Sequence, residues 1–96
     1  MKNILVTGAY GGMGRATVLT LKNQGFRVFA LDRKVGDPEE NIIPIETDIT
    51  DEKEIIKAFE TVKTYTDELF AIVHFAGVYM LDSLVEIENE SFRRIF

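Results

Sequence analysis

The chain has 96 residues, a formal net charge of −5 and no cysteine, so it has room for one domain and none for thiolate chemistry. No apolar run approaches the roughly 20 residues of a membrane span, a single histidine argues against a His-rich metal site, and the acidic balance disfavours nucleic acid. The chain enters a strand pattern at once, without a signal peptide. We therefore expect a cytoplasmic protein with no membrane, metal or nucleic-acid partner.

The first third of the chain alternates between strand and helix patterns. Residues 2–7 form an apolar run that suits a strand buried on both faces of a parallel sheet, and residues 8–14 are rich in glycine. Residues 15–23 show helical periodicity and end just before a glycine, a common helix stop. Residues 26–31 predict the second strand.

The middle of the chain predicts a loop, an edge strand and a second helix. Residues 33–41 hold turn-forming residues, and residues 42–45 predict a strand whose Pro44 favours the edge of the sheet. Asp51 and Glu54 have the spacing of a capping box at the start of the next helix. That helix presents one apolar face, formed by Ile55, Phe59 and Val62.

The last third predicts one more strand and the start of one more helix. Residues 69–76 are the most apolar run of the chain, and Gly77 closes it. A final helix is predicted from Glu88 to the last residue. The resulting order is strand, helix, strand, strand, helix, strand, helix, which requires parallel crossovers.

This order predicts an α/β fold, a Rossmann-type doubly wound parallel sheet with strand order 3-2-1-4. The glycine-rich turn then lies at the centre, where the winding direction reverses. Because the last residue falls inside the predicted final helix, we interpret residues 1–96 as the N-terminal part of a single dinucleotide-binding domain, truncated after the fourth strand. We expect that strand to self-associate or to pair with the missing half.

The glycine-rich turn has the spacing of a phosphate-binding loop. It lies between a strand and a helix whose N-terminus offers free N–H groups and a positive dipole end to a pyrophosphate. Gly8 permits the tight turn, Gly12 keeps side chains away from the pyrophosphate, and Gly14 lets the helix approach the strands. The alternative is a plain glycine turn, but the flanking elements favour a dinucleotide site.

An acidic residue follows at the expected distance. Asp32 ends the second strand, 18 residues after Gly14, where a carboxylate accepts hydrogen bonds from the adenosine ribose. Because it would repel a 2′-phosphate, Asp32 favours NAD over NADP. Arg33 and Lys34 point the other way, since a nearby cation can hold that phosphate, and a solvated strand-end aspartate is the remaining alternative.

Taken together, these motifs resemble the start of a short-chain dehydrogenase/reductase. The resemblance extends over the whole chain, in order and at ordinary spacing. The matching segments are Thr7–Ala16, Leu31–Arg33, Asp48–Asp51, Ala76–Gly77 and Ser91–Phe96.

The resemblance implies roles for further residues. Met13 would offer its backbone N–H to the pyrophosphate, Asp48 would accept from the adenine amino group, and Ile49 would pack on the adenine ring. Ala76 and Gly77 would lie along the cofactor ribose. For Asp48, spacing alone fits an acid near a helix N-terminus almost equally well.

The resemblance also implies an activity: the chain would be the NAD(P)-binding portion of an oxidoreductase that moves hydride between nicotinamide and a small carbonyl or alcohol substrate. The family's catalytic Ser and Tyr-x-x-x-Lys lie beyond Phe96, so no residue here is nominated as catalytic. The family's N-N-A-G motif reads His74-Phe75-Ala76-Gly77, without its two amides. His74 either replaces one amide or is a part-buried structural histidine.

Two alternatives remain open. The chain could be a non-catalytic dinucleotide-binding fragment. Its glycines also fit T-G-x-x-G-x-x-G through Gly8, Gly11 and Gly14, the spacing of the family's extended branch of nucleotide-sugar epimerases and dehydratases. The Ser91–Phe96 segment favours the shorter branch.

Overall fold

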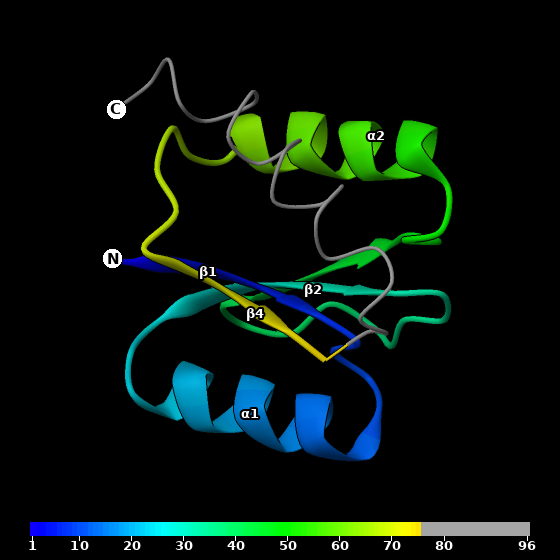
Figure 1. The fold of residues 1–96 in the computed structure, drawn as a ribbon. Helices are drawn as coiled ribbons and strands as arrows, with labels where there is room; N and C mark the ends of the chain where they lie inside the picture. Colours follow the sequence, from blue (N-terminus) through cyan, green and yellow to red (C-terminus); the bar gives the residue numbers. More distant parts are fainter. Residues whose placement is uncertain (76–96) are drawn as a thin grey trace.

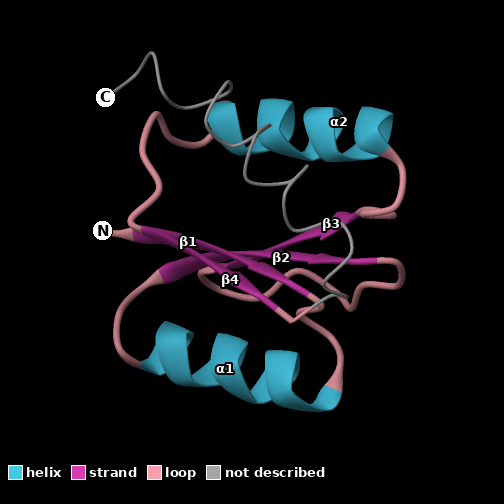
Figure 2. Ribbon diagram, in the orientation of Figure 1, coloured by secondary structure: helices cyan, strands magenta, loops and turns pink. Residues whose placement is uncertain are grey.

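The computed structural model of this chain describes residues 1–75. The predictions for Ala76 and Gly77 and for the last helix therefore lie outside the described residues. Within residues 1–75, the elements follow the predicted order (Figure 2). They are β1 (Asn3–Thr7), α1 (Gly12–Asn23), β2 (Arg27–Asp32), β3 (Ile42–Glu46), α2 (Glu52–Lys63) and β4 (Ala71–His74).

The strands form one parallel sheet in the order β3-β2-β1-β4, which confirms the predicted fold class and strand order. The two helices lie on opposite faces of this sheet, α1 on one side and α2 on the other (Figure 1). Pro44 lies on the edge strand β3, as predicted. The first crossover leads from β1 through α1 to β2, and the second leads from β3 through α2 to β4 on the other side of β1. The winding direction therefore reverses at β1, where the segment between β1 and α1 begins.

Each face of the sheet packs its own apolar core. Because successive strand residues point to opposite faces, Leu5 and Phe29 pack with Phe59 on the α2 side. On the α1 side, Ile4 and Val28 form a second core cluster with Val18 of α1. Every residue of β1 is buried, which explains its uninterrupted apolar run.

Helix α2 begins at a side-chain cap but makes no capping box. Asp51 accepts from the Lys53 N–H at 3.0 Å. Glu54 accepts from the backbone N–H of Asp48 at 2.9 Å and does not reach back to the cap. The reason is local: the Asp51 N–H already donates to the Asp48 carbonyl, which closes a turn before the helix. The capping-box prediction is therefore half right.

Two element boundaries differ from the prediction. Helix α1 begins at Gly12, inside the glycine-rich segment, because the first helical turn is built from glycines that carry no helical pattern. β4 covers only Ala71–His74 and not the whole of 69–76. Its length is set by β1, which pairs with it only from Ile4 to Thr7.

Candidate dinucleotide-binding site

The glycine-rich turn joins the end of β1 to the start of α1. Gly8 has a φ of +66°, a left-handed conformation that favours glycine. A Cβ on Gly14 would lie 1.9 Å from the Gly8 carbonyl oxygen, so no side chain fits there. Gly8 permits the tight turn and Gly14 the close approach, as the sequence predicted.

The N-terminus of α1 is open. Its N-cap residue is Gly11, no side chain caps the first turn, and that turn holds no acidic residue. A Cβ on Gly12 would meet nothing within 4 Å, and Met13 is 74% exposed. The N–H groups at the start of a helix have no partner inside it, so here they are available to an anion. The chain leaves space where the sequence predicts a pyrophosphate.

Asp32 is tied to the glycine-rich turn by a contact that the sequence did not reveal. One carboxylate oxygen accepts from the Tyr10 N–H at 3.0 Å, and the other accepts from the Arg33 N–H at 2.8 Å. An ionised carboxylate accepts about four hydrogen bonds, so capacity remains for ribose hydroxyls. The adjacency of β1 and β2 is the only signal that could have predicted the Tyr10 contact.

Asp48 and Ile49 follow β3 at the end of the sheet where Asp32 also lies. Asp48 accepts from the Thr50 hydroxyl at 2.6 Å and backbone N–H at 2.9 Å, and it pairs with Arg33 at 3.3 Å. These contacts hold the pKa of Asp48 below its usual value, and the hydrogen bond from the Thr50 hydroxyl has the largest effect. The Ile49 side chain packs, partly buried, against the core under α2. The adenine-binding roles of both residues stay predictions.

His74 ends β4 and lies beside the end of β1. Its Nδ1 is 3.4 Å from the hydroxyl oxygen of Thr7, which is fully buried. Burial lowers the pKa of His74, so the neutral imidazole is favoured. This contact fits the structural alternative for His74.

The predicted residues lie together at the carboxyl end of the sheet, because parallel strands all end on the same side. The glycine-rich turn follows β1, Asp32 ends β2, Asp48 follows β3 and His74 ends β4. Ala76 and Gly77 lie outside the described residues. Among residues 1–75, no three histidine or carboxylate side chains gather as a metal site. In the same part of the chain, neither helix is long and apolar enough to cross a membrane.

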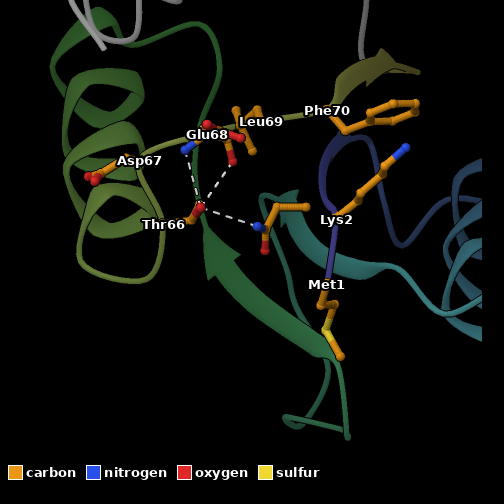
Figure 3. Close-up of a pocket in the computed structure, with 8 residues that line it drawn as sticks. Met1, Lys2, Thr66, Asp67, Glu68, Leu69 and Phe70 are labelled. Carbon is orange, nitrogen blue, oxygen red and sulfur yellow. Dashed lines mark hydrogen bonds between the residues drawn. The ribbon is translucent and has the colours of Figure 1, made fainter. Parts of the chain in front are cut away.

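A cavity of about 540 Å³ lies at the opposite end of the sheet (Figure 3). The start of β1 and the loop before β4 form its walls, and none of the predicted site residues lines it. Two of its polar side chains contact each other: the Asn3 amide donates to the Thr66 hydroxyl at 3.2 Å. The lining residues are Met1, Lys2, Asn3, Thr66, Asp67, Glu68, Leu69 and Phe70.

Residues 2–96 match the sequence profile of the short chain dehydrogenase family. The chain belongs to the short-chain dehydrogenase/reductase family. Dehydrogenase/reductase SDR family member 11 from Bos taurus is 29% identical over 104 residues, which is 96% of this chain and 41% of the relative. The chain thus spans about two fifths of the length of that relative.

Solved structures of other proteins share the fold. NADPH-bound carbonyl reductase from chicken fatty liver superimposes with a TM-score of 0.80 at 19% identity, over 99% of this chain and 48% of that one. A short chain dehydrogenase from Leptospira borgpetersenii with bound NAD+ gives a TM-score of 0.71 at 21% identity, over 94% of this chain and 41% of that one. The first of these structures holds NADPH and the second holds NAD+.

Proposed function

We propose that residues 1–96 form the NAD(P)-binding part of a single-domain oxidoreductase that transfers hydride between nicotinamide and a carbonyl or alcohol substrate. The observation that carries this proposal is the uncapped N-terminus of α1 behind a turn in which Gly14 admits no side chain. A bound nicotinamide cofactor supplies the hydride chemistry, and this chain holds its phosphates and adenosine. A cytoplasmic location, expected from the sequence, stays a prediction.

Within this site we propose specific contacts. The backbone N–H groups of Gly12, Met13 and Gly14 would face the pyrophosphate, since they begin a helix without a side-chain cap. Asp48 and Ile49 would border the adenine, because they follow β3 at the same edge of the sheet. Ala76 and Gly77 would run along the cofactor ribose, as the family motif implies.

NAD is the proposed cofactor over NADP. Asp32 stands at the end of β2 with acceptor capacity for ribose hydroxyls, and its charge would repel a 2′-phosphate. Arg33, one of the cations that argued for NADP, is paired with Asp48.

The experiment is equilibrium binding of NADH and NADPH to the complete protein that contains this chain. Asp32→Ala is expected to weaken NADH binding about tenfold, the worth of one or two charge-assisted hydrogen bonds, and NADPH binding less. Asp37→Ala removes an exposed acid of the loop that follows β2 and is the matched control. Equal losses for the two cofactors would remove Asp32 from the ribose role.

Turnover distinguishes the alternatives. NADH oxidation with any of a panel of aldehydes and ketones supports the oxidoreductase, whereas tight NADH binding without turnover favours a non-catalytic dinucleotide-binding protein. Turnover only with nucleotide sugars favours the extended branch. A complete protein that binds neither dinucleotide would overturn the proposal.

A further inference from the structure

The loop between β2 and β3 is fastened to α1 by one carboxylate. Glu39, in that loop, accepts from the Arg15 guanidinium with an N–O distance of 2.6 Å. Its other carboxylate oxygen is 4.0 Å from the ammonium of Lys22, about two turns further along the same face of α1. The Arg15 hydrogen bond comes first among the causes that lower the pKa of Glu39, so this residue is ionised near neutral pH. A single negative charge therefore engages two cations of α1.

Tyr10 connects this ion pair to Asp32, the residue proposed to bind the ribose. The Arg15 guanidinium lies 5.6 Å from the centroid of the Tyr10 ring. The backbone of the same tyrosine donates to Asp32. The ring also lies against Gly36, where an added Cβ would come within 3.1 Å of a ring carbon. Tyr10 thus contacts Arg15 with its ring and Asp32 with its backbone.

Arg15 has unused hydrogen-bonding capacity beside the Tyr10 ring. Among residues 1–75, its second terminal nitrogen is buried and has no hydrogen-bond partner. A guanidinium with a free N–H beside an adenosine ribose is the group that binds a 2′-phosphate best, since it pairs with phosphate oxygens in a bidentate manner. In this chain, Glu39 neutralises that guanidinium and holds its other end.

We propose that Glu39 is a specificity-determining residue that engages Arg15 and Lys22, keeps them from a 2′-phosphate, and so favours NAD over NADP. The inference rests on the proposed dinucleotide-binding function. Two carboxylates would then disfavour NADP: Asp32 at the end of β2, and Glu39 in the loop that follows. Selectivity then depends on how this loop is fastened to α1.

The test measures dissociation constants of NADH and NADPH for the complete protein carrying Glu39→Gln. The expected result is a shift of the affinity ratio towards NADPH by roughly tenfold, the worth of one charge-assisted hydrogen bond. Glu40→Gln removes the neighbouring exposed charge and is the matched control, with the ratio unchanged. The Arg15→Gln/Glu39→Gln double variant is expected to return the ratio towards wild type, because Arg15 is the group that is set free.

Each outcome is decisive. Arg15 and Glu39 are about one third exposed, and exposed ion pairs contribute little to stability, so the variant is expected to fold. An unchanged ratio, or equal weakening of both cofactors, would overturn the inference and leave Glu39 as a support for the loop. A wild-type protein that binds neither cofactor would instead overturn the proposed function itself. A shift that persists in the double variant would show that Arg15 is not the group responsible.

Discussion

Gly14 and Gly12 have different roles in the turn, which alanine substitutions can separate. Gly14→Ala places a Cβ 1.9 Å from the Gly8 carbonyl oxygen, where only backbone movement relieves the clash. We expect a loss of about 3 kcal/mol in the free energy of unfolding, measured by urea denaturation, together with loss of NADH binding.

Gly12→Ala is the matched control for that prediction. Its Cβ enters open space, so no loss of stability is expected, and the variant should unfold at the wild-type urea concentration or above. NADH affinity should still fall, because the methyl group occupies the space proposed for the pyrophosphate. Equal stability losses in Gly12→Ala and Gly14→Ala would contradict the assignment of these separate roles.

His74 makes stability depend on pH at the residue scale. Its pKa in the folded chain lies below the ordinary 6.5, so between these two values the unfolded state binds more protons. The histidine's contribution is therefore complete above pH 6.5 and is lost as the pH falls through its folded pKa. We expect the free energy of unfolding to drop between pH 7 and about pH 5, where carboxylates titrate little. His74→Asn should flatten this slope, and a slope that persists would assign it to other groups.

At the scale of the element, the stability of α2 depends on the residue that caps its N-terminus. The Asp51 carboxylate satisfies the Lys53 N–H, one of the donors without a partner inside the helix. Asp51→Ala is expected to lower the free energy of unfolding by about 1 kcal/mol, measured by thermal or urea denaturation. Asp51→Asn keeps an acceptor and should retain most of that stability. If both variants lost the same amount, charge near the helix and not the cap would be responsible.

Elements and their contacts differ in how far the sequence predicts them. The strands and helices follow from the spacing of apolar residues, and the strand order follows from right-handed crossovers around a central glycine turn. The start of α1 was misplaced because its glycines carry no periodic signal. The contacts of Tyr10 with Asp32 and of Glu39 with Arg15 join segments whose approach depends on loop conformation, which no local pattern encodes.

For the whole molecule, the two edges of the sheet differ in how well they resist pairing. The edge strand β3 carries Pro44, which has no N–H to donate, so it is a poor template for another strand. β4 has no proline, and within residues 1–75 no strand pairs with its outer side. Phe70 and Phe75, which flank it, are 58% and 37% exposed. Exposed backbone groups beside exposed aromatic rings favour association at β4.

A chain limited to residues 1–96 is therefore expected to self-associate, with a sedimentation coefficient that rises with protein concentration. Phe75→Lys should weaken this association, because a charge beside the edge opposes burial against a second copy. Ile56→Lys, on a position of α2 that is 40% exposed, is the matched control and should associate like the wild type. A concentration-independent monomer would mean that the outer edge of β4 is not an association surface, and equal effects of both lysines would assign association to general surface hydrophobicity instead of this strand.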